Sequence, residues 1–473
     1  MSRSSNLSRL HLGALRDVAT FRAHVADLQI QIPCDDELTG SLADPLDRSG
    51  IHLGNRFAIQ PMEGWDGTAD GRPTDLTFRR WEHFGLSGAK LIWGGEAVAV
   101  RHDGRANPNQ LAINAHSSED LNALREAVTR STTDLLVGLQ LTHSGRYSRP
   151  NAHSRPEPKI LYHHPLLDQR LGIPSDYPLL TDSNIREIVQ DFCKASKLAQ
   201  DAGFDFVDIK HCHGYLGHEF LSAHTREGDY GGSFANRTRF LREVVQGVRS
   251  LAPRLEIAVR FSAFDTVPFQ RDKFGTGTPE TLNWLLPYRW GFGVNTENPT
   301  EYDLREPIEF MHLLSQLGVK LVNISAGSPY YNPHVQRPAF YPPSDGYLPP
   351  EDPLLGVARQ MEVTRILKQK FPELIIVGSA YSYLQDFLPY VAQAAVREGW
   401  TDCVGLGRMI LSYPSLPHDV IQGRQLQRRK ICRTFSDCTS APRAGLPSGC
   451  YPLDPEYRHS ENAALLKRFK AQK

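Results

Sequence analysis

Eight short β-rich runs, each followed by a longer helical pattern, constrain the fold of this chain more than any other feature. The runs cover residues 56–61, 90–96, 135–141, 204–210, 255–261, 320–325, 374–378 and 403–407. In one intervening segment, capped by Thr181, apolar side chains recur at helical spacing at Ile185, Ile188, Val189 and Phe192. Eight strand-plus-helix units predict an α/β fold of the (β/α)8 TIM barrel class. No G-x-G-x-x-G follows the first run, which disfavours a doubly wound sheet.

The spacing of these runs divides the chain into three parts. We expect an N-terminal extension over 1–50 that packs at the end of the barrel opposite the site, a barrel over 51–430 and a C-terminal tail over 431–473. Two βα-loop insertions, 147–180 and 265–301, are long and rich in Pro, Gly and aromatic residues. Both follow strands, so we expect them over the C-terminal face, with the second acting as a lid.

Composition narrows the class of function. Lys plus Arg and Asp plus Glu both total 53, so the net charge is +0, and no basic run marks a nucleic-acid binder. No apolar stretch approaches the roughly 18 residues that span a bilayer, and seven scattered cysteines do not suggest a secreted disulfide framework. We expect a cytoplasmic protein that acts on a small molecule, without nucleic-acid or membrane partners. Whether it forms a homo-oligomer stays open.

The fourth run ends in an unusual group of polar side chains. Lys210, His211, His213 and Tyr215 follow a buried-looking strand within six residues. Barrel enzymes carry their reactive groups at the C-terminal ends of strands, although polar residues also end strands without any chemical role. Strict strand alternation would place His211 and His213 on one face and Lys210 on the other.

Seven segments of the chain, taken in order, resemble the old yellow enzyme family of FMN-dependent ene reductases. They are 55–62, 95–100, 138–146, 213–216, 229–237, 259–262 and 405–408, within a resemblance that covers roughly 45–417. The resemblance implies an NAD(P)H-dependent flavin oxidoreductase that passes hydride through FMN to an activated alkene, of the enone or enoate type. Two alternatives remain: an oxidative demethylase of an N-methylated amine or amino acid, and a barrel that binds a ligand without turnover.

The resemblance also implies which residues contact FMN. They are Pro61, Met62, Ala97, Gln140, Arg260, Gly378, Ser379, Gly407 and Arg408. Their chemistry agrees: the Gln140 amide can donate and accept, as a flavin pyrimidine edge requires. The Arg260 guanidinium can stabilise negative charge on reduced flavin. Glycines that end the seventh and eighth strands leave room for phosphate beside Arg408.

For the reaction itself, the resemblance implies that Tyr215 donates a proton to substrate carbon, because a phenol of pKa about 10 stays protonated at neutral pH. The family register makes Lys210 and His213 the substrate anchor, where relatives carry His-x-x-His or His-x-x-Asn. We favour Lys210 over His211 as the partner of His213. Glu63 also departs from the family, and a carboxylate there would oppose electron uptake unless it is protonated, paired or turned away.

The tail carries three cysteines, Cys432, Cys438 and Cys450. Larger relatives with an iron–sulfur cluster have four cysteines in this region. At the position of their second cysteine, this chain has Phe435. Cluster binding needs a full set of thiolates, so we expect a degenerate motif and no metal. From the position of Lys473 we expect no second nucleotide-binding domain of the kind that those relatives carry.

Overall fold

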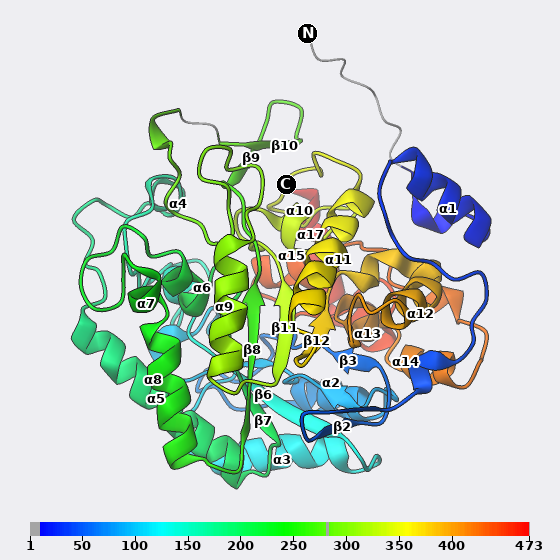
Figure 1. Ribbon diagram of the computed structural model, residues 1–473, viewed down its shortest axis with the longest axis horizontal. Coiled ribbons are helices and arrows are strands. Elements are labelled where there is room, and N and C mark those ends of the chain that lie inside the picture. Colours follow the sequence, from blue (N-terminus) through cyan, green and yellow to red (C-terminus); the bar gives the residue numbers. More distant parts are fainter. Residues whose placement is uncertain (1–9, 281–282, 473) are drawn as a thin grey trace.

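The computed structural model describes residues 10–280 and 283–472, and its centre is a closed barrel of eight parallel strands (Figure 1). The strands are β3 (Phe57–Ile59), β4 (Leu91–Ile92), β6 (Leu136–Thr142), β7 (Phe206–Ile209), β8 (Glu256–Ser262), β11 (Leu321–Ser325), β12 (Ile375–Gly378) and β13 (Cys403–Leu406). Strand β13 pairs with β3, and β4 with β6, so the sheet closes on itself. The predicted (β/α)8 TIM barrel is confirmed, because each expected run contains one strand.

An outer layer of helices covers the barrel. After the successive strands come α2 (Asp75–Gly85), α3 (Ser117–Thr129), α5 (Asp182–Asp201), α8 (Arg239–Leu251), α9 (Arg305–Gln316), α11 (Pro353–Lys370), α12 (Leu388–Arg397) and α14 (Leu416–Ile421). Helix α5 confirms the expected periodicity: Ile185, Ile188 and Phe192 are buried, and the Thr181 side chain accepts a hydrogen bond from the Asn184 backbone N–H. Helix α5 therefore packs an apolar stripe onto the sheet.

The second strand is shorter than the sequence predicts. It stops at Ile92 and resumes as β5 (Ala97–Ala99) beside β6. Gly95 lies between them with φ of 53°, and a Cβ there would lie 2.5 Å from the Trp81 ring. Glu96 turns its side chain into a buried ion pair with Arg80. The expected strand 90–96 is thus wrong in its second half, because this segment bends to bury a carboxylate.

The N-terminal end of the barrel is closed by a hairpin. Strands β1 (Leu46–Arg48) and β2 (Ile51–Leu53) are antiparallel, and their apolar side chains pack against residues inside the barrel. Helix α1 (Val18–Asp27) lies elsewhere, beside α12 (Figure 1), where Phe21 stacks on Phe387 with ring centroids 4.6 Å apart. We expected the 1–50 segment to pack at the N-terminal end of the barrel, and of its described parts the hairpin does so. The hairpin also crosses the expected boundary at position 50.

Long connections cover the opposite, C-terminal end. The two predicted insertions carry α4 (Pro165–Leu171), the hairpin of β9 (Phe269–Arg271) and β10 (Gly277–Pro279), and η5 (Asn283–Leu285). A third, which the sequence analysis missed, runs over 326–352 and carries α10 (Pro333–Gln336). The other short helices are η1 (Leu12–Ala14), η2 (Ser41–Ala43), η3 (His102–Gly104), η4 (Gly145–Tyr147), α6 (Leu216–Leu221), α7 (Phe234–Arg237), η6 (Tyr381–Phe387), α13 (Arg408–Ser412) and η7 (Arg428–Lys430).

The tail folds onto the barrel through α15 (Asp437–Arg443), α16 (Pro455–Arg458) and α17 (Glu461–Ala471). Tyr451, Tyr457 and Leu466 form a small core of their own. Two hydrogen bonds of 2.8 Å join Arg79 of α2 to Asp454. In Figure 1 the labels of α15 and α17 lie near α10, at the end away from the β1–β2 hairpin. The tail therefore belongs to the C-terminal face.

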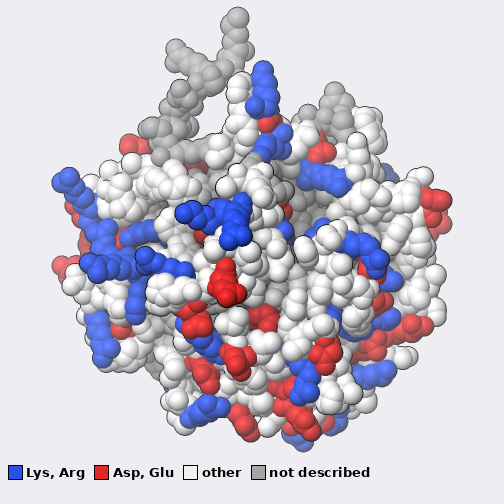
Figure 2. All heavy atoms as spheres, turned by 180° about the vertical axis from the view of Figure 1, so that it is seen from behind, with Lys and Arg blue, Asp and Glu red and all other residues white. Residues whose placement is uncertain are grey.

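The surface carries both signs of charge. On the face in Figure 2, Lys and Arg side chains are interspersed with Asp and Glu, and neither sign covers the face. Among the described helices, none is long and apolar enough to cross a bilayer.

Candidate active site

A cavity opens at the C-terminal end of the barrel and gathers most of the predicted site residues. It is lined by Pro61, Met62, Gln140, Lys210, His213, Tyr215, Arg260, Ser379, Gly407 and Arg408. Ala97 and Gly378 do not line it: Ala97 O accepts a hydrogen bond of 2.9 Å from Gln110, and Gly378 lies beside Tyr381. The ends of six different strands thus converge on one site, as in other barrels.

The cavity also contains residues that the sequence analysis did not assign to the site. Tyr330, Gln336 and Arg337 come from the 326–352 connection, and Cys438, Thr439, Pro442, Arg443 and Ser448 come from the tail. The missed signal was the Pro-rich segment of 27 residues between the sixth strand and α11. Connections of that length without regular structure commonly carry functional residues.

One wall of the cavity presents an unpaired hydrogen-bond acceptor. The Gln140 amide nitrogen donates to the Asp208 carboxylate at 2.6 Å, and the Trp93 indole and the Arg260 backbone N–H also donate to Asp208, each at 2.7 Å. Gln140 Oε1 has no partner among the described residues, so it remains available to an N–H donor in the cavity. From the sequence, the Gln140 amide could either donate or accept a hydrogen bond in the cavity. In the structure its nitrogen donates to the buried Asp208, so only its oxygen is available to a ligand.

Two arginines in the cavity form no ion pair with the described carboxylates. Arg260 Nε and Arg408 Nη1 are buried without a hydrogen-bond partner, and neither guanidinium forms an ion pair within the described parts of the chain. Burial lowers the pKa of Arg260. A Cβ built on Gly407, directly before Arg408, would meet only Met62 Sδ at 3.7 Å and Gln60 Cβ at 4.0 Å. Buried cations require a partner, so this part of the cavity is suited to an anionic ligand.

A chain of four polar groups forms the other side. Lys210 Nζ lies 2.9 Å from Glu63 Oε1 and 3.9 Å above the centre of the Tyr215 ring. Tyr215 donates to Glu63 Oε2 at 2.8 Å, and its oxygen is 3.0 Å from that of Tyr330. Burial and the Glu63 carboxylate raise the pKa of Tyr215 well above its usual value. Tyr215 therefore stays protonated, and Glu63 is paired rather than free.

The structure places Lys210, rather than His211, beside His213 in the cavity. The His211 ring is buried between the barrel and the outer helices, 6.0 Å from both Phe240 and Phe310, with Nδ1 2.8 Å from Ile209 O. His213 has φ of 66°, in the left-handed region. This turn breaks strand alternation and returns the His213 ring to the cavity side.

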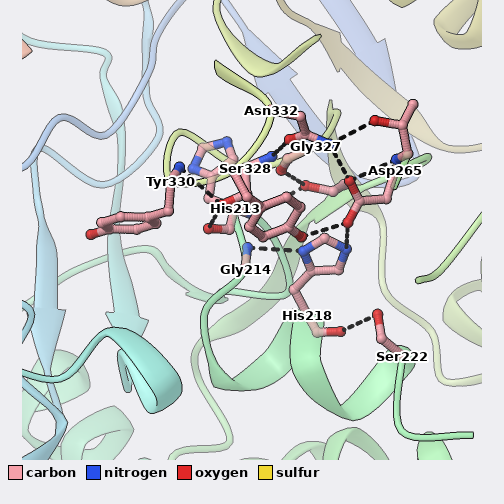
Figure 3. A network of polar contacts seen from close by, with 12 residues as sticks. His213, Gly214, His218, Ser222, Asp265, Gly327, Ser328, Tyr330 and Asn332 are labelled. Carbon is pink, nitrogen blue, oxygen red and sulfur yellow. Dashed lines mark hydrogen bonds and ion pairs between the residues drawn. The ribbon is translucent and has the colours of Figure 1, made fainter. Parts of the chain in front are cut away.

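A buried network fixes this turn (Figure 3). The Ser328 hydroxyl donates to His213 O at 2.9 Å, and the Gly214 N–H donates to His218 Nδ1 at 2.9 Å. Asn332 accepts from the Ser328 N–H at 2.6 Å and donates to Asp265 at 2.5 Å. Burial raises the pKa of Asp265 to about 6. These contacts tie the fourth-strand motif to the 326–352 connection and hold His213 and Tyr215 in place.

The expected lid does not reach the cavity. No described residue of the 265–301 insertion lines it; positions 281–282 lie outside the described residues. Of its aromatic residues, Tyr288 is buried against His164, with its oxygen 3.1 Å from His164 Nε2, while Trp284 is 69% exposed on the surface. The interpretation of this insertion as a cover over the ligand is wrong, because the 326–352 connection and the tail occupy that position.

The three tail cysteines are free thiols. Burial raises the pKa of Cys432 and of Cys450. No group of three or more His, Cys, Asp or Glu residues within 10–280 and 283–472 is arranged to hold a metal ion.

Comparison with known proteins agrees with this geometry. Residues 41–283, more than half of the chain, match the NADH:flavin oxidoreductase / NADH oxidase family, so the chain belongs to this family, that of the old yellow enzymes. It is 33% identical over 217 residues to an NADPH dehydrogenase of Clostridium acetobutylicum, covering 45% of this chain and 61% of that one. An NADH:flavin oxidoreductase of Gibberella zeae is 27% identical over 316 residues, 62% and 70% of the two chains. The alignment with the Clostridium relative thus spans less than two thirds of its length.

Solved structures share the fold. A 2-naphthoyl-CoA reductase in complex with 2-naphthoyl-CoA superposes with a TM-score of 0.66 at 18% identity, over 88% of this chain and 57% of that chain. The old yellow enzyme homologue of Zymomonas mobilis gives 0.56 at 22% identity, over 82% and 94%. Likeness at this level of identity establishes the barrel and nothing finer.

The cofactor of this family is FMN, and the cavity fits it on three observations. Gln140 Oε1 is a free acceptor for an N–H of the ring, and Arg260 Nε is buried without a hydrogen-bond partner among the described residues. Arg408 and the open space at Gly407 and Ser379 are suited to a phosphate. Pro61 and Met62 supply apolar surface to the same cavity. These residues could therefore hold the ring at the Gln140 and Arg260 end and the phosphate at the Arg408 end.

Proposed function

We propose that this protein is an FMN-dependent oxidoreductase that moves hydride from NAD(P)H to an activated alkene. When bound, FMN supplies the hydride-carrying ring; the chain supplies substrate binding and the proton. The observation that carries the proposal is the placement of a protonated Tyr215 in the same cavity as Gln140 and Arg260, next to Lys210 and His213. Reduction of a carbon–carbon double bond needs such a positioned acid.

The proposed role of Tyr215 is to give its proton to the substrate carbon next to the activating group. Its hydroxyl donates to Glu63 in the structure, and a substrate in the cavity would compete for that hydrogen bond. The Tyr330 hydroxyl, 3.0 Å away, can replace the proton that Tyr215 gives up. Burial raises the pKa of Tyr330 to about 12, so Tyr330 is also protonated at neutral pH.

The proposed anchor for the substrate carbonyl is His213 with Lys210. Burial lowers the pKa of His213 well below its usual value, so its imidazole is neutral. The Lys210 ammonium is a hydrogen-bond donor whose charge is compensated by Glu63 at 2.9 Å. Because the Lys210–Glu63 ion pair has no net charge, we propose a neutral enone as the substrate in preference to an enoate. The carboxylate of an enoate would add a third charge beside Glu63.

Anaerobic half-reactions test the proposal. Purified protein loaded with FMN should lose its flavin absorbance when mixed with NADPH or NADH, and 2-cyclohexenone should restore it. Flavin that no nicotinamide reduces would reject the proposal.

A second candidate is the oxidation of an amine, and Glu63 is the observation that favours it. Glu63 accepts a hydrogen bond from the Tyr215 phenol and binds the Lys210 ammonium at 2.9 Å, so this carboxylate can also bind the ammonium group of a ligand. A histamine dehydrogenase from Rhizobium sp. 4-9 shares the fold, with a TM-score of 0.63 at 21% identity. The same anaerobic experiment separates the two candidates, because under this alternative an amine alone bleaches the flavin.

A further inference from the structure

Arg337 is a third cation of the cavity, and neither the strand motifs nor the mechanism above assigns it a role. It follows α10 in the 326–352 connection and lines the cavity together with Arg408. A hydrogen bond also links Arg408 to the backbone next to Arg337. Arg408 Nη2 donates to the carbonyl oxygen of Pro338, the residue after Arg337, at 2.8 Å. Both therefore lie at the end of the cavity that we assign to phosphate.

The charge of Arg337 has no counter-ion within 10–280 and 283–472. Its guanidinium donates to two neutral groups, the hydroxyls of Thr439 and of Ser436, the latter at 3.0 Å. Its Nε is buried without a partner, and Arg337 forms no ion pair with any carboxylate of the described residues. Burial and the nearby Arg408 lower the pKa of Arg337 to about 10, so Arg337 remains charged at neutral pH. Two like charges buried together need an anion between or beside them.

The tail holds Arg337 in this position. Thr439 lies in α15 and Ser436 directly before it, and both hydroxyls accept hydrogen bonds from the same guanidinium. The Ser436 hydroxyl in turn donates to Tyr341 O at 2.6 Å, which fixes it to the 326–352 connection. Hydroxyls orient a guanidinium without neutralising it, so its charge remains available to a ligand.

We propose that Arg337, oriented by the tail, is a second cationic ligand of the FMN phosphate and binds it jointly with Arg408. Two guanidiniums match the dianionic charge of a phosphate monoester, and each offers a planar pair of donors. The proposal rests on FMN binding in this cavity. It also gives the degenerate tail a function: the segment after Cys432 supplies hydroxyls that place a phosphate ligand.

Comparison of FMN with riboflavin tests this assignment, because riboflavin has the same ring and lacks the phosphate. Dissociation constants would be measured by quenching of flavin fluorescence for the wild-type chain and for Arg337→Met. Loss of a charged hydrogen-bond donor should weaken FMN binding about 10- to 100-fold. Riboflavin binding should change by less than about twofold, within the error of such comparisons. The FMN affinity of Arg337→Lys should lie between that of the wild type and that of Arg337→Met.

A matched control is Arg359→Met in α11, because Arg359 is paired with Glu351 by two hydrogen bonds of 2.9 Å and does not line the cavity. It should leave the preference for FMN over riboflavin unchanged. Thr439→Val should reduce the preference less than Arg337→Met does, since it removes only one of the groups that orient Arg337.

A second readout keeps the test independent of folding defects. Arg337→Met removes an uncompensated buried cation, so the flavin-free variant should melt no lower than the flavin-free wild type, and FMN should raise its melting temperature less. Equal losses of FMN and riboflavin affinity would overturn the role at the phosphate. So would an unchanged preference together with weaker NADPH binding, which would place a nicotinamide phosphate at Arg337. If the wild-type chain binds neither flavin, the proposed function itself fails.

Discussion

Glu63 and Lys210 form an ion pair of 2.9 Å inside the cavity, joining the loop after the first strand to the end of the fourth. Each residue departs from the family pattern, and the charge of one compensates the charge of the other. The pair resolves the difficulty that Glu63 raises, because a carboxylate paired with an ammonium adds no net charge beside a flavin. Replacing either residue alone should therefore change ligand affinity, because it leaves the charge of the other residue unpaired.

The two single substitutions should change ligand affinity in opposite directions. Glu63→Gln leaves the Lys210 ammonium unpaired, so a phenolate such as ionised 4-hydroxybenzaldehyde should bind about tenfold more tightly, the effect of a partly buried charge. Lys210→Met leaves Glu63 unpaired and should weaken the same ligand by a similar factor. Titration of the flavin absorbance band measures both. A shift in the same direction in both variants would show that charge is not what couples them.

Tyr215→Phe should slow one half-reaction only. Re-oxidation of reduced flavin by 2-cyclohexenone should fall about 10²-fold or more, because carbon protonation loses its acid. Reduction by NADPH should stay within about twofold, since it needs no proton from the chain. Stopped-flow absorbance at each step gives the two rates. Tyr330→Phe is the control: it keeps Tyr215 and should slow re-oxidation less. Equal slowing of both half-reactions by Tyr215→Phe would make Tyr215 structural.

The 265–301 insertion should have little influence on ligand choice. Trp284 is an aromatic of this insertion that is 69% exposed and lies outside the cavity. Trp284→Ser should leave the affinities for FMN and for phenols within about twofold of the wild type. Tyr330→Ala, within the cavity, should change phenol binding in the same assay. A loss of phenol affinity in Trp284→Ser would restore the insertion as a cover.

Burial of neutral histidines should make the protein sensitive to acid. Burial lowers the pKa of His211 to about 4 from 6.5. Between these values the unfolded chain binds a proton that the folded chain does not, so the free energy of unfolding falls as pH drops from 6.5 towards 4. His211→Leu should remove about 3 kcal/mol of that fall, by the linkage of about 1.4 kcal/mol per pKa unit.

Urea denaturation of the wild type and of His211→Leu at several pH values measures this slope. His116→Gln is the control, because His116 lies on the surface and should not alter it. A slope in His211→Leu equal to that of the wild type would contradict burial of His211 in its neutral form.

The barrel and most of its cavity could be predicted from the sequence, because both follow from local patterns. Apolar runs at regular intervals predict the strands, and strand ends converge in any closed barrel. Arg260 and Gln140 needed no more than that rule. His213 required one further step: its left-handed backbone returns its side chain to the cavity, whereas strand alternation alone would have kept it with His211 on the face opposite Lys210.

The remainder depended on long-range packing. Arg337 and Arg443 reach the cavity because the tail and the 326–352 connection pack on each other, through contacts between residues about a hundred positions apart. No local pattern marks such contacts. The lid interpretation of 265–301 was wrong for the same reason, since its aromatic content was visible in the sequence and the competing cover was not.

The central claim is that the cavity holds FMN and passes hydride from nicotinamide to an enone. Anaerobic titration of the FMN-loaded protein with NADPH, followed by 2-cyclohexenone, tests it most directly. The account predicts one flavin bleached per chain and full recovery of absorbance with one saturated ketone formed per flavin. Flavin that remains oxidised with both NADPH and NADH, or that is bleached by an amine alone, would contradict it.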